Sequence, residues 1–125
     1  MGDADRLVLE GMEFFGHHGD LAAERELGSR IYVDVEIGLE LSIAGDSDRL
    51  EDTLDYVRCF ELVREVVERA QHRLLEAVAA RIAEALLREP QAQRVRVRVA
   101  KQPPIPGGIQ RVAVVVERAR ARGAA

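Results

Sequence analysis

Apolar and polar residues alternate along several short stretches of the chain. Residues 31–41 put an apolar side chain at almost every second position and acidic or neutral side chains between them. This period of two is typical of a β-strand with one buried face. Residues 94–100 repeat the pattern with valine and arginine, and residues 6–15 and 111–117 are similarly rich in apolar and β-branched side chains. The sequence therefore predicts four strands.

Between the second and third strands the apolar pattern changes to the period of an α-helix. Residues 57–70 and 74–88 each carry an apolar stripe at helical spacing, which predicts two amphipathic helices lying side by side. Asp55 is a suitable N-cap for the first helix. The second should end before Pro90, because the residue preceding a proline disfavours the helical conformation. One more helical turn is expected in the stretch LAAERELG, which ends at Gly28.

The order of these elements is ββααββ, with strands and helices in separate blocks. Such segregation predicts an α+β fold, an antiparallel four-stranded sheet with two helices on one face. On the other face, an acidic strand carrying Asp34, Glu36 and Glu40 can offset a basic strand carrying Arg94, Arg96 and Arg98 if the two strands lie close together. The sheet still has two open edges. Proteins commonly cover such edges by pairing them with another copy, so we expect a homo-oligomer joined strand to strand.

The composition narrows the class of protein. With 125 residues, of which 47% are hydrophobic and 32% charged, the chain is expected to form a single domain over residues 1–125. The net charge of -4 argues against a nucleic-acid partner. Cys59 has no second cysteine to pair with, and no apolar run is long enough for a signal peptide or a membrane span. We therefore expect a cytoplasmic protein with no membrane partner, whose Arg/Ala/Gly tail frays after about residue 118.

Lys101 is the only lysine among the 18 basic residues of the chain. It follows the strand predicted at 94–100 and precedes the proline-rich stretch QPPIP. An ammonium group can lose its proton where its surroundings disfavour charge, whereas a guanidinium group stays protonated. The position is therefore a candidate for proton transfer. A solvated lysine left at a strand end by chance is the competing explanation.

Two adjacent histidines and two glycines follow the first strand in the stretch FFGHHGDLAAE, residues 14–24. Loops at strand ends commonly carry functional sites, and imidazole is a frequent zinc ligand. A tetrahedral zinc site needs three or four converging ligands, however. The other available ligands, His72 and Cys59, lie in the helical segment and lack a supporting spacing. No metal site is predicted.

Glu24, Tyr56 and Glu76 each have an ordinary structural explanation when taken singly: a solvated helix face, packing, and a helix N-terminus. Their combined pattern is more specific. The stretches FFGHHGDLAAERELG, DTLDY, LLEAVAARIA and VAKQPPIPG occur in this order and at spacings that closely resemble dihydroneopterin aldolase of folate biosynthesis. The resemblance covers residues 6–117. HG with a following AE, D-T-x-x-Y, LLE, and K with PPIP are weak signals alone and specific together.

This resemblance implies a fold, an assembly and a reaction. Members of the family have the tunnelling fold, in which ββααββ subunits join their sheets edge to edge in a ring, commonly as an octamer of two stacked tetrameric rings. Their pterin substrate, 7,8-dihydroneopterin, is cleaved to 6-hydroxymethyl-7,8-dihydropterin and glycolaldehyde, with epimerisation as a frequent side reaction. The resemblance implies no metal, no cofactor and no lysine Schiff base.

The resemblance also assigns roles to individual residues. Lys101 matches the catalytic lysine beside the reacting side chain, and Glu24 matches the carboxylate that orients it and a water. Tyr56 matches the residue that handles the proton of the enol-like intermediate, and it reaches the pocket from the neighbouring subunit.

Four further positions correspond to the substrate-binding residues of the family. Glu76 matches the anchor of the pterin, because a carboxylate can accept two parallel hydrogen bonds from the 2-amino and N3 hydrogens of the ring. Leu75, with Thr53 and Leu54 of the neighbouring subunit, is expected to supply main-chain hydrogen bonds and pocket walls. Asp20 and residues 107–110 depart from the family pattern at the pocket rim.

Three alternatives use the same features differently. An epimerase acting on dihydroneopterin or its triphosphate would cleave and remake the same bond. A zinc-dependent enzyme of the pyruvoyl-tetrahydropterin synthase type would need a His-x-His unit, and His17, His18 and His72 do not supply that spacing. A non-catalytic pterin-binding ring would need Glu76 but not Lys101.

Overall fold

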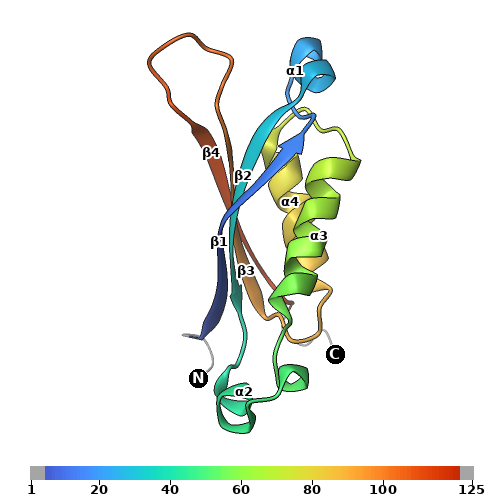
Figure 1. The fold of residues 1–125 in the computed structure, drawn as a ribbon, viewed down its shortest axis with the longest axis vertical. Coiled ribbons are helices and arrows are strands. Elements are labelled where there is room, and N and C mark those ends of the chain that lie inside the picture. The colour runs from blue at the N-terminus through green and yellow to red at the C-terminus, as the bar shows by residue number, and fades with distance from the viewer. Residues whose placement is uncertain (1–4, 122–125) are drawn as a thin grey trace.

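The computed structural model describes residues 5–121, and within them four strands form one antiparallel sheet (Figure 1). The strands lie in chain order, β1-β2-β3-β4, so that β1 and β4 form the two edges. Their bounds are β1 Arg6–Gly16, β2 Ser29–Gly38, β3 Arg94–Lys101 and β4 Val112–Ala119. The predicted four-stranded antiparallel sheet is confirmed.

Two long helices, α3 (Tyr56–Arg69) and α4 (Leu75–Leu87), cover one face of this sheet (Figure 1). Asp55 is the N-cap of α3, as predicted, and its carboxylate accepts a hydrogen bond of 2.9 Å from the Val57 amide. The short helix α1 (Ala22–Leu27) corresponds to the turn expected before Gly28. The α+β architecture with both long helices on one face is therefore confirmed.

The apolar core lies between the sheet and the two long helices. Alternate residues of β2 and β3 point into it, and the burial of each such side chain contributes about 1.5–3 kcal/mol to folding. The buried strand residues include Ile31, Val33, Val35, Ile37, Val95, Val97 and Val99, and the helices add Cys59, Val63, Val67, Val78, Ile82 and Leu86.

The opposite face of the sheet carries paired charges. Asp34 lies opposite Arg98, and Glu36 lies opposite Arg96, with carboxylate–guanidinium distances of 3.6 Å in both pairs. Glu117 of β4 also contacts Arg96, at 3.4 Å. Exposed pairs of this kind contribute less than about 1 kcal/mol each. The predicted offset between the acidic and basic strands is confirmed for these residues, whereas Glu40 lies beyond the end of β2.

The structure corrects one predicted boundary and adds two short helices between β2 and α3. β2 ends at Gly38 rather than at residue 41, because both of its neighbours stop pairing there, β1 at Arg6 and β3 at Arg94. A short helix α2 (Ser42–Ser47) and a 3-10 helix η2 (Leu50–Asp52) follow. Neither was predicted, because neither buries a residue and so neither carries an apolar stripe.

The first residues of the C-terminal tail are more ordered than its composition predicts. β4 continues to Ala119, and the Arg120 side chain donates hydrogen bonds to the main-chain oxygens of Leu87, Glu89 and Ala92 at 2.7–3.1 Å. The prediction of fraying is therefore wrong for residues 119 and 120. Residues 122–125 of the tail lie outside the described residues.

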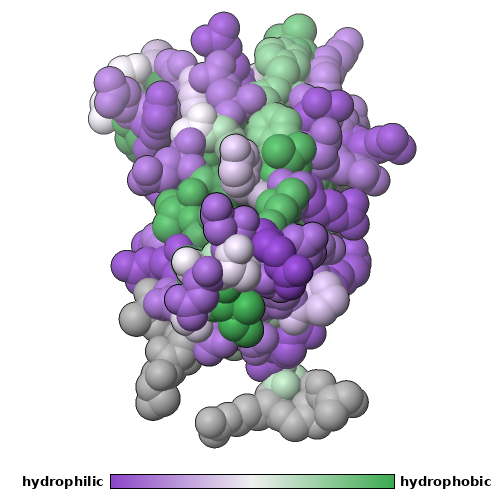
Figure 2. Space-filling model, turned by 60° about the horizontal axis from the view of Figure 1, so that its bottom comes forward, coloured by the Kyte–Doolittle hydropathy of each residue, from purple (hydrophilic) through white to green (hydrophobic). Residues whose placement is uncertain are grey.

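The end of the molecule formed by α2, η2 and the start of α3 exposes several large apolar side chains. Figure 2 turns this end forward, and hydrophobic surface is visible among hydrophilic side chains. The exposed apolar residues here are Ile43, Leu50, Tyr56 and Val57. Within residues 5–121, none of the helices has the length and apolar character needed to cross a membrane.

Candidate active site

Lys101 is the last residue of β3, and its side chain is buried at one end of the sheet, with the residue only 8% exposed. Its ammonium group donates hydrogen bonds to Glu24 Oε2 at 2.8 Å and to the main-chain oxygen of His18 at 3.3 Å. Pro103, two residues further on, is buried as well. Lys101 is therefore a lysine held by specific acceptors, and the explanation as a solvated strand end is wrong.

Glu24 occupies the third position of α1, where its carboxylate makes two contacts. Oε1 accepts a hydrogen bond of 3.2 Å from the Leu21 amide at the helix start, while Oε2 accepts the bond from Lys101. The bond from Lys101 is the main reason that the pKa of the Glu24 carboxyl is below its ordinary value, and burial acts in the opposite direction. The helix start thus fixes a charged carboxylate beside the amine.

The two glycines of the GHHG stretch leave room for these side chains. A Cβ on Gly19 would lie 2.4 Å from Glu24 Cβ and 2.5 Å from Glu24 Cδ. A Cβ on Gly16 would lie 2.8 Å from Cδ2 of the His18 ring. All three distances are well inside the van der Waals contact of about 3.5–4.0 Å. Larger residues at either position would displace the side chain that faces them.

His18 is fully buried, and both of its ring nitrogens have partners. Nε2 lies 2.7 Å from the main-chain oxygen of Val67, and Nδ1 accepts a hydrogen bond of 3.1 Å from the His72 amide. In His17, Nδ1 bonds the main-chain oxygen of Arg25 at 2.9 Å. Burial is the main cause that lowers the pKa of the His18 ring, while the hydrogen bond to Val67 opposes it.

These contacts also argue against a metal site at the histidines. His18 has no free ring nitrogen to offer a metal, and its ring stacks on that of His72 with 5.6 Å between centroids. Cys59 is buried in α3, where burial raises the pKa of its thiol to about 11 and so disfavours the thiolate that binds metals. In the described part of the chain no three His, Cys, Asp or Glu side chains form a metal-binding group.

The start of α4 lies at the same end of the molecule as Lys101. The loop before α4 is tied to the loop after β1 by a 3.0 Å hydrogen bond from the Gly19 amide to the His72 oxygen. Leu75 is buried at the first position of α4, and Glu76 beside it is exposed. Lys101, Glu24, Leu75 and Glu76 are thus gathered at one end.

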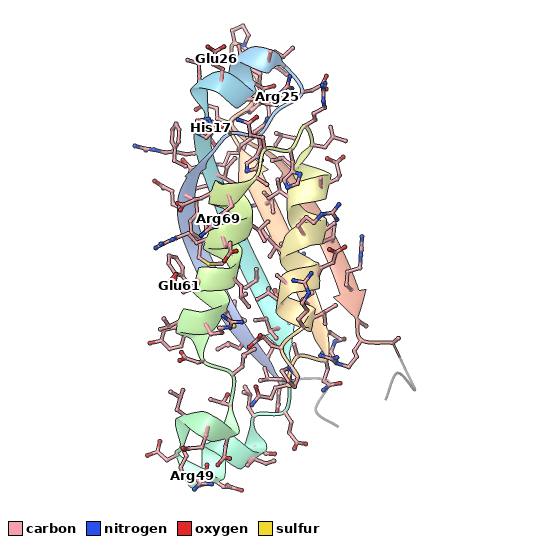
Figure 3. All side chains as sticks on the ribbon, turned by 90° about the vertical axis from the view of Figure 1, so that its right-hand side faces the viewer. His17, Arg25, Glu26, Arg49, Glu61 and Arg69 are labelled. Atoms are coloured by element: carbon pink, nitrogen blue, oxygen red, sulfur yellow. The ribbon has the colours of Figure 1, made fainter. Side chains whose placement is uncertain are left out.

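Thr53, Leu54 and Tyr56 lie at the opposite end of the molecule. Tyr56 begins α3, whose 14 residues span about 20 Å before the chain turns towards α4. Figures 1 and 3 agree on this separation: α1, with the labelled Arg25, is at one end, and the segment of α2 and Arg49 that leads to Thr53 is at the other. Leu54 is buried in the core, whereas Tyr56 is 63% exposed. A single chain therefore does not bring all seven predicted site residues together.

Sequence reasoning noted the GHHG stretch but missed what its residues and Arg25 do. Arg25 Nη1 donates hydrogen bonds to the main-chain oxygens of Gly19 at 2.8 Å and Asp20 at 2.7 Å, so it holds the loop from the α1 side. The side chain of Asp20, which departs from the family pattern, contacts Arg73 at 3.6 Å. The only indication of these roles in the sequence was that the residues lie within a few positions of Glu24 along the chain.

The fold and the site define the class of protein: an α+β enzyme with a hydrogen-bonded ion pair of lysine and glutamate at one end of its sheet. Comparison with known proteins makes the class specific, since residues 7–117 match the family described as "FolB: Dihydroneopterin aldolase". The chain belongs to the dihydroneopterin aldolase family, as the sequence motifs predicted.

Three relatives illustrate the match. The dihydroneopterin aldolase of Bacillus subtilis is 40% identical over 116 residues, which is 91% of this chain and 97% of the relative. The E. coli dihydroneopterin aldolase in complex with neopterin superposes with a TM-score of 0.85 at 29% identity, over 91% of this chain and 98% of that one. The dihydroneopterin aldolase from Burkholderia thailendensis bound to guanine gives a TM-score of 0.80 at 27% identity, over 95% and 93% of the two chains.

Proposed function

We propose that this chain cleaves 7,8-dihydroneopterin by a retro-aldol reaction in folate biosynthesis, releasing glycolaldehyde and 6-hydroxymethyl-7,8-dihydropterin. The observation that carries the proposal is the contact of 2.8 Å between Lys101 Nζ and Glu24 Oε2, which lies partly buried at the end of the sheet. Membership of the dihydroneopterin aldolase family supports the substrate. The neopterin and guanine bound by two relatives support a ligand whose ring presents an amino group beside a ring N–H.

The proposed reaction needs one proton taken and one proton given. Lys101, acting itself or through a water that it holds with Glu24, takes the proton of the substrate's side-chain hydroxyl. The adjacent carbon–carbon bond breaks, glycolaldehyde leaves with a new carbonyl, and the bonding electrons enter the C6=N5 imine of the substrate ring. The enol-like intermediate then receives a proton on its side-chain carbon. Because the ring accepts the electrons, the protein needs neither a metal nor a Schiff base for this step.

Glu76 is the proposed anchor of the pterin ring. Its carboxylate would accept hydrogen bonds from the 2-amino and N3 hydrogens, and the main chain at Leu75 would add a further contact. This role is supported by the exposure of Glu76 in the first turn of α4 and by the hydrogen bond that ties the preceding loop to Gly19.

The remaining proposed residues, Tyr56, Thr53 and Leu54, would come from a neighbouring subunit. A distance of about 20 Å along α3 separates Tyr56 from the end that carries Lys101, so one chain cannot supply both to one substrate. The unpaired edges β1 and β4 offer the surfaces for assembly. We propose a homo-octamer of two stacked tetrameric rings, with the sites between subunits and Tyr56 moving the proton of the enol-like intermediate.

The activity is tested by incubating the purified protein with 7,8-dihydroneopterin, with and without a chelator, and measuring glycolaldehyde. Equal release in both samples is expected. Inversion of the side chain without glycolaldehyde would identify an epimerase instead, and loss of turnover with the chelator would identify a metal enzyme. Pterin binding without any reaction would identify a binding ring. Each of these three outcomes contradicts the proposal.

The shared site is tested by mixing two inactive variants, Lys101→Ala and Tyr56→Phe. Subunits that exchange in the mixture can form a site with an intact lysine from one chain and an intact tyrosine from the other. Activity should therefore reappear in the mixture while each variant alone stays inactive. A mixture that forms mixed oligomers, verified by native mass spectrometry, and remains inactive would contradict the assignment of Tyr56 to the neighbour.

A further inference from the structure

The His18 ring can satisfy its two partners in only one protonation state. The Val67 oxygen can only accept a hydrogen bond and the His72 amide can only donate one. The Nε2 atom, 2.7 Å from Val67, must therefore carry the proton, and Nδ1, 3.1 Å from the His72 nitrogen, must be bare. A charged ring would put an N–H against the His72 amide. Complete burial of the ring favours the same neutral form.

The main chain of His18 and Gly19 contacts both members of the proposed acid–base pair, Lys101 and Glu24. The oxygen of His18 accepts the 3.3 Å hydrogen bond from Lys101 Nζ. The next residue, Gly19, bonds the His72 oxygen through its amide and packs against Glu24. One short loop, fixed by the ring to the corner between α3 and α4, thus carries one acceptor of Lys101 and sets the space for the other.

We propose that His18 is a positioning residue for Lys101: its ring, bonded to Val67 and His72, holds its own main-chain oxygen where that oxygen directs the amine. This inference rests on the function proposed above. In this role the buried histidine of the GHHG stretch contributes to the reaction without contacting the substrate. The ring acts through the loop, so its loss should disturb the amine more than it disturbs the pterin anchor at Glu76.

Three substitutions at position 18 test the two hydrogen bonds of the ring separately. Asparagine at position 18 can keep an acceptor for the His72 amide, because its side-chain oxygen lies near the position of Nδ1. Glutamine can keep a donor for the Val67 oxygen, because its nitrogen reaches the position of Nε2. Leucine keeps neither bond. The matched control is Val63→Ala, which opens a cavity in the middle of α3 and lowers stability without touching the loop.

We expect His18→Leu to lower kcat about 10- to 100-fold at a temperature where it is fully folded, because a displacement of about 1 Å is enough for such a loss. The KM and the Kd for neopterin should stay within about threefold. His18→Asn and His18→Gln should each recover part of kcat, and Val63→Ala should keep wild-type kcat despite its lower stability. The inference is wrong if His18→Leu turns over at the wild-type rate, or if Val63→Ala loses kcat to the same extent.

Hydrogen exchange of the His72 amide tests the geometry without any turnover. Exchange should stay slow in His18→Asn and become faster in His18→Gln and His18→Leu, since only asparagine keeps the acceptor. Equal exchange in all three variants would overturn the inference. If the variants show this exchange pattern but the wild-type protein releases no glycolaldehyde, the proposed function is contradicted, and with it the part of His18 in the reaction.

Discussion

Replacing Gly19 with alanine should separate Glu24 from Lys101 while leaving the rest of the fold in place. A Cβ at this position would lie 2.4 Å from Glu24 Cβ, 2.5 Å from Glu24 Cδ and 2.6 Å from Glu24 Oε1. All three atoms belong to the same side chain. Because three atoms of Glu24 are too close at once, the whole Glu24 side chain must move rather than one terminal atom.

The size of the movement follows from these distances. Comfortable contact requires about 3.5 Å, so Glu24 must retreat by about 1 Å. A retreat directed away from Lys101 would lengthen the 2.8 Å contact with Lys101 Nζ to about 3.8 Å, which is no longer a hydrogen bond. A misplacement of about 1 Å can cost a factor of about 100 in rate, which corresponds to about 2.7 kcal/mol of transition-state stabilisation.

The assay compares kcat for glycolaldehyde release by Gly19→Ala, the wild type and Gly45→Ala. Gly45 is a matched control, because it lies in α2 and a Cβ there meets nothing within 4 Å. Gly45→Ala should therefore keep full activity. We expect Gly19→Ala to lose about 100-fold in kcat with little change in the Kd for neopterin, since Glu76 is not displaced. A folded Gly19→Ala protein with kcat within twofold of wild type would refute the reasoning.

Three other predictions follow from the site and its surroundings. Lys101→Ala should abolish turnover with only a modest loss of neopterin binding, and Lys101→Arg should be nearly inactive because a guanidinium does not release its proton; an active arginine variant would reduce Lys101 to a charge. Glu76→Ala should chiefly raise the Kd for neopterin, measured by equilibrium dialysis, and unchanged binding would place the anchor elsewhere. The free energy of unfolding in urea, at fixed protein concentration, should fall between pH 7.5 and pH 5.5. Burial lowers the pKa of His18 and His72 from the ordinary 6.5, so below that pH the unfolded chain binds more protons, at up to about 1.4 kcal/mol per pH unit for each histidine. Stability that rises towards pH 5.5 would contradict the lowered values.

Local patterns in the sequence predicted most of the secondary structure. The strands and the two long helices follow from the periods of two and 3.6, because each period reports which side of an element is buried. The same logic explains the errors. α2 and η2 bury nothing and so leave no pattern, and the end of β2 depends on where its neighbours stop pairing, which residues 39–41 do not encode.

The motifs likewise indicated Lys101 and Glu24 as candidates, and the family resemblance implied that they act together, but the residues alone do not show the contact. These residues are 77 positions apart in the chain, and their contact depends on how the end of β3 meets α1. The buried ring of His18 depends in the same way on the corner between α3 and α4.

The sequence by itself determined the four strands and the two long helices, their order and the chemical groups available for the reaction, because these depend on residue type and short-range spacing. Only the tertiary structure showed which atoms accept the hydrogen bonds of Lys101, Glu24 Oε2 and the main-chain oxygen of His18, and that the length of α3 separates Tyr56 from them. The physical reason is that hydrogen bonds and packing act between atoms a few ångströms apart, whatever their separation along the chain.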